Sequence, residues 1–162
     1  CERRPLHAAG VSCVWRFRLR VSWVHRENHF SIVVQGGRPF ASSGLESEFV
    51  ADVDAVIKGY QPGQGGIDGG GYEIDKSTKD GYFYVRYESL KNGYIDDLEL
   101  ALSDQQPYIL RVRSSSRVGF LDFNVNEKRL NRLAADLRAR GWAAPEITAK
   151  THPDYFAQNA GR

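Results

Sequence analysis

Methionine is absent from all 162 residues of the sequence, including position 1, so we expect a processed or trimmed chain. Long apolar runs are absent too. None approaches the roughly 18–20 residues that a helix needs to cross a bilayer. The sequence therefore predicts a protein without a membrane span of its own, and its length is sufficient for one domain with a buried core.

Cysteine and histidine are scarce, which leaves little material for a metal site. Cys1 and Cys13 can pair, but two cysteines near one terminus do not make a disulfide framework. Among the four histidines, His25 and His29 lie close together, and the residues between them are typical of a turn. We therefore expect no metal site and no cofactor.

An excess of one charge is lacking in the chain as a whole but not in its parts. The net charge of +2 is too small to indicate a nucleic-acid partner. Residues 1–43 carry seven arginines and two acidic residues, residues 44–106 carry five basic and thirteen acidic residues, and residues 107–162 carry ten basic and five acidic residues. Such a chain either neutralises itself when its ends fold over its middle or presents a basic face to an acidic partner.

Residues 1–42 form a basic N-terminal extension in which we expect a β-hairpin. Apolar and polar side chains alternate over 13–23 and a second strand pattern follows at 29–35, with a turn between them. Arginines beside large aromatic side chains are favoured at protein interfaces. The same arginines also suit a phosphate-binding ribbon or a solvated face. The candidate partner-binding residues are Trp15, Arg16, Arg18, Arg20 and Trp23.

The core domain is predicted to span residues 43–142 and to contain two main helices. Ser43 and Glu46 make a capping box at the start of the first helix, which should cover 43–58. An apolar stripe with helical spacing predicts the second helix over 126–140. Both stripes need an apolar surface to pack against, and the segment between the helices offers strands for that purpose.

An antiparallel meander is predicted between the helices, because turn residues such as Asn-Gly separate alternating segments. We expect strands at 81–90, 95–102 and 108–113, with a glycine-rich loop at 61–73 and a C-terminal tail at 143–162. The fold class is therefore α+β. It is a single domain in which an antiparallel sheet packs with two main helices, and the basic N-terminal β-hairpin is added to it.

The stretch RVRSSSRVGFLDFNVNEKR, residues 111–129, joins the last strand to the second helix. Serine hydroxyls can bond the loop backbone there. Asp122 can accept from loop amides or pair with an arginine, and Asn126 can cap the helix. Arg129, one turn into the helix, can reach back toward Asp96 or Asp97. The candidate site consists of Asp96, Asp97, Arg113, Ser114, Ser116, Arg117, Asp122, Asn126 and Arg129.

Two interpretations of this set stay open. One is a structural polar network. The other is an anion pocket, in which Arg113, Arg117, serine hydroxyls and a helix N-terminus hold a phosphate or carboxylate. Catalysis is not indicated, because a serine nucleophile needs a neighbouring base and the stretch contains no histidine. Asp96 and Asp97 are adjacent on a strand, so they point to opposite faces and make a poor acid–base pair.

The order of these motifs resembles the uncharacterised family called domain of unknown function fourteen-ninety-nine. That signature reads as a DD-x-E-aromatic strand, then R-S-x-S-R-x-G, then D-x-G-x-N-x-x-R, and the resemblance covers about residues 82–142. Asn124 stands at the usual glycine and tolerates a positive backbone angle, while Glu127 replaces a usual basic residue. The matching residues are Asp96, Asp97, Glu99, Arg113, Ser114, Ser116, Arg117, Gly119, Asp122, Asn126 and Arg129.

The resemblance implies a fold and a compartment but no activity. Because the family occurs in bacteria and in plastid-bearing eukaryotes, it implies a plastid, thylakoid-associated location, with a bacterial envelope or cytoplasm as the alternative. We expect a non-enzymatic accessory or structural subunit of a larger plastid (photosynthetic) membrane complex, acting through contacts with other protein subunits. The alternative is a small-ligand or anion-binding domain that uses the loop within residues 113–129.

Overall fold

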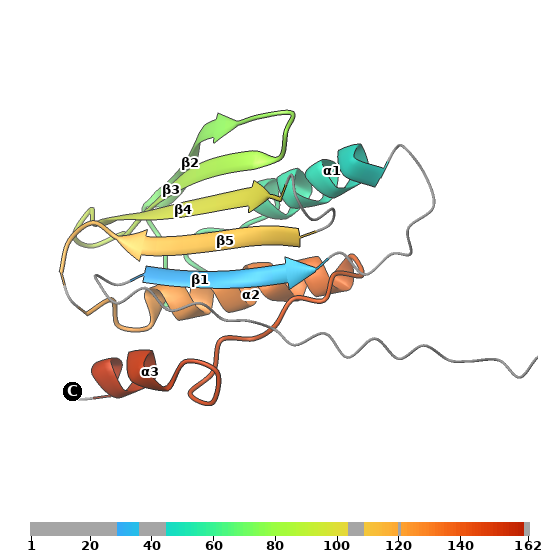
Figure 1. The fold of residues 1–162 in the computed structure, drawn as a ribbon. Coiled ribbons are helices and arrows are strands. Elements are labelled where there is room, and N and C mark those ends of the chain that lie inside the picture. Colours follow the sequence, from blue (N-terminus) through green and yellow to red (C-terminus); the bar gives the residue numbers. More distant parts are fainter. Residues whose placement is uncertain (1–28, 36–44, 104–108, 120, 161–162) are drawn as a thin grey trace, which may run out of the picture.

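A computed structural model of the chain describes residues 29–35, 45–103, 109–119 and 121–160. The described strands form one sheet, and the helices α1 and α2 lie on one side of it (Figure 1). In chain order the elements are β1 (His29–Gln35), α1 (Leu45–Lys58), the short 3-10 helix η1 (Gln64–Gly66), β2 (Gly71–Ser77), β3 (Tyr82–Glu88), β4 (Ile95–Leu102), β5 (Ile109–Ser116), α2 (Val125–Ala139) and α3 (Pro153–Asn159).

The strands form one antiparallel sheet in the order β1-β5-β4-β3-β2. Four of them make a meander, and β1 adds to its β5 edge with Ser31 opposite Arg113. The predicted α+β single domain is confirmed. Of the expected N-terminal hairpin, the second arm is β1 and extends the sheet, whereas the first arm at 13–23 lies outside the described residues.

The core lies between the sheet and the helices α1 and α2, which cover the same face of the sheet (Figure 1). Strands β3, β4 and β5 bury every second residue, because side chains alternate between the faces of a sheet. The buried apolar residues of these strands and helices are Phe83, Val85, Tyr87, Leu98, Leu100, Leu110 and Val112 on the sheet, Phe49, Val53, Val56 and Ile57 on α1, and Leu130, Leu133, Ala134 and Leu137 on α2.

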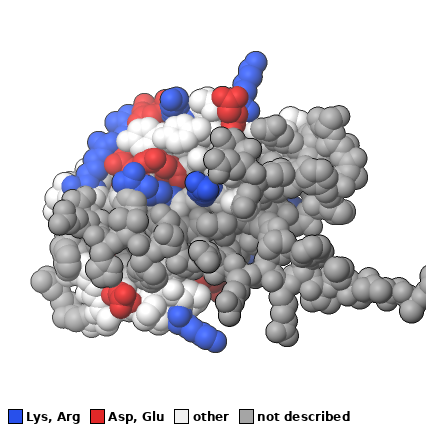
Figure 2. Space-filling view, viewed as in Figure 1, with Lys and Arg blue, Asp and Glu red and all other residues white. Residues whose placement is uncertain are grey.

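The opposite face of the sheet carries charges of both signs. Arg113 donates to Glu99 across β4 and β5 at 3.0 Å. Arg86 on β3 bonds both Glu73 and Asp75 on β2. In Figure 2 basic and acidic side chains intermix over the strands at the top of the view. Cross-strand pairs of opposite charge stabilise such a face modestly.

The glycine-rich segment differs from its prediction. We expected a loop over 61–73, but η1 lies within it and β2 begins at Gly71. Tyr72 and Ile74 on β2 pack against the core. The glycines ahead of them supply turns with positive φ, such as 82° at Gly63 and 105° at Gly71. The sequence did not predict β2, because the segment is rich in glycine and its apolar alternation is limited to Tyr72 and Ile74.

The helices end close to their predicted bounds, with α1 at 45–58 and α2 at 125–139. The capping residue Ser43 lies outside the described part of the chain. No helix in the described ranges combines the length and the apolar character needed to cross a membrane.

Residues after α2 contribute to the core. Trp142, Ala144, Ile147 and Tyr155 are buried in the same apolar cluster as the helices and the sheet. Trp142 also donates from Nε1 to Asp52 on α1 at 3.1 Å. The predicted boundary between a core domain at 43–142 and a tail at 143–162 stays a prediction. A boundary at that place would separate Ala144, Ile147 and Tyr155 from the core cluster that contains them.

Candidate functional site

Arg129 lies near the start of α2, with its side chain fully buried between the helix and the sheet. Its Nε donates to Oδ2 of Asp68 at 2.9 Å, and its Nη2 donates to Oδ1 of the same carboxylate. Nη2 also donates to Oδ2 of Asp96 at 2.7 Å. Asp68 precedes β2 and Asp96 lies on β4, so the arginine joins three segments that are distant in the sequence.

The remaining edge of the guanidinium is held as well. Nη1 donates to Oδ1 of Asn126 at 2.8 Å and to Oγ of Ser114 at 3.2 Å. The group lies over the ring of Tyr87, 4.6 Å from the ring centre. Burial alone lowers the pKa of Arg129, but hydrogen bonds and charge from the two carboxylates outweigh burial and raise that pKa. The group is therefore a buried cation with its partners in place.

Asp68 has a third donor in the hydroxyl of Tyr60, which follows α1 and donates to Oδ2. Burial, followed by the neighbouring carboxylate, raises the pKa of Tyr60, so the hydroxyl keeps its proton. Asp68 is only 3% exposed, and both of its oxygens accept hydrogen bonds. This residue lies in the glycine-rich segment, and we did not predict it as part of the site.

Asp122 organises the start of α2. Its carboxylate accepts from the backbone N–H of Asn124 at 3.1 Å and of Asn126 at 3.0 Å. It also accepts from the hydroxyl of Tyr155 on α3 at 2.8 Å. The expected contact with loop amides is confirmed. Asn124 has a φ of 63°, so it occupies the left-handed region, as its position at the family's usual glycine predicted.

The predicted capping role of Asn126 is wrong. The helix begins at Val125, and Asn126 lies inside its first turn with no exposed surface. Its Nδ2 donates to the hydroxyl of Ser116 at 3.0 Å, and its Oδ1 accepts from Ser114 and Arg129. The side chain points to the sheet because Asp122 already satisfies the backbone N–H groups at this end of α2.

Asp97 lies on the opposite face of the sheet from Asp96, as the alternation predicted. Arg117 donates to it from Nε at 2.9 Å and from Nη2 at 2.8 Å. The hydroxyl of Tyr84 donates to Asp97 at 2.7 Å. Burial alone raises the pKa of Asp97, but these two donors outweigh burial and hold that pKa below its usual value.

The structure thus divides the predicted set between the two faces of the sheet. Asp68, Tyr60 and Tyr155 belong to the buried group although no local pattern indicated them. The predicted partner-binding residues Trp15, Arg16, Arg18, Arg20 and Trp23 lie outside the described residues. The buried group contains Asp96, Ser114, Asp122, Asn126 and Arg129, with the partly buried Ser116 at its margin, and the outer group contains Asp97, Arg113 and Arg117.

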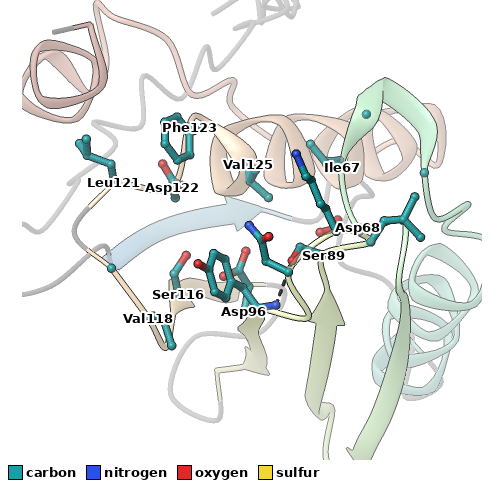
Figure 3. Close-up of a pocket in the computed structure, with 18 residues that line it drawn as sticks. Ile67, Asp68, Ser89, Asp96, Ser116, Val118, Leu121, Asp122, Phe123 and Val125 are labelled. Carbon is teal, nitrogen blue, oxygen red and sulfur yellow. Dashed lines mark hydrogen bonds between the residues drawn. The ribbon is translucent and has the colours of Figure 1, made fainter. Parts of the chain in front are cut away.

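A pocket of about 750 Å³ opens beside the buried group, at the end of the sheet shown in Figure 3. Three loops line it: the glycine-rich segment at 63–69, the β3–β4 hairpin at 89–94, and the loop between β5 and α2. Its lining includes the carboxylates of Asp68, Asp96 and Asp122, which are 3%, 8% and 6% exposed. The polar network therefore forms part of the wall of a pocket.

Large apolar side chains stand at the opening of this pocket. Leu90 is 79% exposed, Tyr94 51%, Val118 58% and Phe123 68%, and all four line the pocket. Among the described residues whose side-chain exposure is known, they are the large apolar side chains classed as exposed. Within the described part of the chain, the exposed large apolar side chains are therefore concentrated at one place.

The charge of the lining is acidic rather than basic. Lys91 is the basic residue among the lining residues, whereas Arg113 and Arg117 are absent from them. Those two arginines each pair with a carboxylate on the outer face of the sheet. No group of three or more histidine, cysteine or acidic side chains is placed to hold a metal ion within the described ranges. The geometry favours a cationic or apolar ligand over an anion at this place.

A family model described as "Protein of unknown function (DUF1499)" matches residues 26–137. The chain belongs to this family. The DUF1499 match includes β1 to β5, α1, and α2 up to Leu137, so Asp68, Asp96 and Arg129 all lie within it. The suspected resemblance is confirmed and extends to the N-terminal side of the motifs that carried it. A search of the curated proteins gives no match.

Proposed function

We propose that this DUF1499 chain is a non-enzymatic accessory subunit that binds another protein, and that the pocket beside Asp96 is where the partner docks. The observation that carries the proposal is that Leu90, Tyr94, Val118 and Phe123 all surround one opening. Single exposed apolar residues are normal on a protein surface, whereas a group of them around a concave site is typical of binding sites.

The network beneath the pocket supports the same role. Arg129 joins the loop that contains Asp68 to β4 and to α2, and Asp122 fixes the loop that enters α2. Two of the three loops that line the pocket are therefore tied to the core by hydrogen bonds of the buried residues Asp68 and Asp122. A preformed site loses less conformational entropy when it binds, which favours affinity.

The setting in the proposal is a plastid membrane complex, with the subunit peripheral to the thylakoid. This part rests on the distribution of the family in bacteria and plastid-bearing eukaryotes. A bacterial envelope or cytoplasm remains the alternative setting. The partners in the proposal are other protein subunits.

A second candidate function is a small-ligand-binding domain. The pocket volume of about 750 Å³ falls within the range of small-molecule sites. The loop that we predicted for such a role, within residues 113–129, contributes Ser116, Val118 and Phe123 to the lining. The large exposure of the apolar residues at the opening favours the protein partner, because a ligand inside the pocket would leave them in water.

The experiment is quantitative co-purification from the native membrane fraction. Full-length tagged wild type is compared with a Leu90→Ser/Phe123→Asn double variant, in which asparagine suits the φ of 54° at position 123. Tyr82→Ser, on the outer face of the sheet, is the matched control. We expect the same partner with wild type and control, and its loss with the double variant at an unchanged melting temperature. Equal recovery with all three proteins, or a chain that purifies alone, contradicts the proposal.

A further inference from the structure

We infer that the pocket receives a lysine or arginine side chain from an apolar segment of the partner protein, and that this cation binds Asp96. The inference rests on the proposed function, because it names the chemistry of the partner at the same pocket. Three observations lead to it: the charge around the pocket, an oxygen of Asp96 to which no described residue donates, and the position of the apolar side chains.

The charge around the pocket is negative. Three carboxylates, of Asp68, Asp96 and Asp122, line it, and one guanidinium, of Arg129, lies buried behind them. Three carboxylates and one guanidinium leave a formal excess of two negative charges. Lys91 stands on an exposed hairpin at the opening and is too well solvated to neutralise buried carboxylates fully. A cation that enters the pocket is therefore attracted by its walls.

Hydrogen bonds select Asp96 among the three carboxylates. Both oxygens of Asp68 accept from Arg129, and both oxygens of Asp122 accept from backbone N–H groups. Asp96 accepts from Arg129 through Oδ2, and no residue in the described part of the chain donates to its Oδ1. Its side chain is 11% exposed and lines the pocket. This oxygen is the open acceptor for an incoming N–H group.

The apolar side chains indicate that the cation arrives on a protein segment. Leu90, Val118 and Phe123 line the pocket with exposed side chains, which stay in water unless a larger surface covers them. Lysine and arginine have long aliphatic stems that pass along apolar surface while their charged ends lie beyond it. Apolar neighbours of such a residue would pack on the opening, where the aromatic residues Phe123 and Tyr94 line the pocket, and a guanidinium can pack over an aromatic ring.

A purely structural role accounts for less of this arrangement. Asp96 helps to neutralise Arg129, but Asp68 already binds that guanidinium through two nitrogens. A structural role also gives no reason for Leu90 and Phe123 to be exposed beside the carboxylate. The cationic partner accounts for the charge, the open oxygen and the apolar opening together.

The test uses three synthetic pentapeptides, acetylated and amidated, of sequence Phe-Leu-X-Leu-Phe, in which X is lysine, its uncharged isostere norleucine, or glutamate. Each is titrated into the full chain by calorimetry at low and high salt, and NMR shifts of the amides near Asp96 and Phe123 locate the binding. We expect the lysine peptide to bind about tenfold more tightly than the norleucine peptide, as charge-assisted hydrogen bonds allow. High salt should reduce this advantage, and the glutamate peptide should bind most weakly.

Two substitutions assign the effect to the pocket. Asp96→Asn should remove most of the preference for lysine over norleucine. Because this change also removes a partner of Arg129, Lys91→Gln provides a second test at an exposed position. It should strengthen binding of the lysine peptide roughly twofold to threefold by removing a like charge. Lys79→Gln, in the turn at the other end of β3, is the matched control and should have no effect.

The outcomes separate this inference from the proposed function. If the lysine and norleucine peptides bind with equal affinity and both shift the pocket amides, the inference of a cationic side chain is wrong, and the proposed docking at this pocket is retained. If no peptide shifts the pocket amides, the result contradicts both the proposed docking function and the inference of a cationic side chain. If n-pentylammonium alone binds as tightly as the lysine peptide, the pocket binds a small amine, and the inference that the cation belongs to a protein segment is wrong.

Discussion

Arg129 is a charged residue in surroundings where an unpaired charge is very costly. Its side chain has no exposed surface, and it lies between two carboxylates and the ring of Tyr87. A buried ion pair contributes little compared with apolar residues of equal volume, but removing one partner leaves an uncompensated charge. The network is therefore more sensitive to single changes than its net contribution to stability suggests.

Replacing Arg129 with methionine should lower the free energy of unfolding by about 3–5 kcal/mol, because Asp68 and Asp96 then keep buried negative charges without their cation. Denaturant unfolding measures the change. Arg113→Met is the control, since Arg113 and Glu99 form an exposed pair that should contribute under about 1 kcal/mol. A similar loss in the free energy of unfolding in both variants would show that the buried Arg129 network is no more sensitive than an exposed ion pair.

The pair of Asp97 and Arg117 predicts a pH dependence. The pKa of Asp97 in the folded state lies below the ordinary value of 3.8, so its contribution to stability is complete above that pH and is lost as pH falls through the folded-state pKa. The difference in unfolding free energy between wild type and Asp97→Asn should therefore be constant from pH 7 to about 5 and shrink below about 4. A difference that stays constant to pH 2 contradicts the depressed pKa.

At the scale of elements, Asp122 forms hydrogen bonds with two helices, α2 and α3. It accepts from the backbone at the start of α2 and from Tyr155 on α3. Asp122→Ala should cost about 1–3 kcal/mol, because buried donors lose their acceptor. Hydrogen exchange should become faster at Asn126 and over α3. Asp154→Ala, at an exposed position in the first turn of α3, should change neither segment measurably. Unchanged exchange of α3 in Asp122→Ala would show that packing alone holds that helix.

The elements with a regular apolar period could be predicted from the sequence. Strands β3, β4 and β5 alternate, and α1 and α2 carry apolar stripes, so burial on one side fixes both type and position. β2 could not be predicted in the same way, because its alternation is limited to Tyr72 and Ile74 after a run of glycines. Short apolar patterns beside turn residues do not separate strand from loop.

The site was predictable only in its local part. Spacing within 111–129 indicated that Ser114, Asp122 and Arg129 act together, and the structure brings them into one region. Asp68 lies 61 positions from Arg129, in a segment whose composition indicates only a loop. No periodicity connects the two residues, since their contact depends on how the whole sheet packs on α2. Sequence patterns report local geometry and give no signal for such contacts.

At the scale of the whole molecule, the charge distribution follows the fold. The acidic middle of the chain and the basic segment after it meet across strands and between helices. This arrangement supports the self-neutralising interpretation for the described C-terminal part, while residues 1–28 lie outside the description. The pairs that join these two segments are Arg129 with Asp68 and Asp96, Arg113 with Glu99, Arg117 with Asp97, and Arg140 with Asp52.

Also at the scale of the whole molecule, the structure predicts that residues 143–162 are not a separable tail. Ile147 is 1% exposed and Tyr155 6% exposed, and both lie in the core cluster. A chain that ends at residue 142 loses this burial and the donor to Asp122. Since truncating one buried isoleucine costs about 2–5 kcal/mol, the shortened chain should unfold at clearly lower denaturant. A chain that ends at residue 160 is the control and should match the full chain. If the chain ending at 142 keeps full stability, the division into core and tail holds, and the contacts of Ile147 and Tyr155 contribute little to the fold.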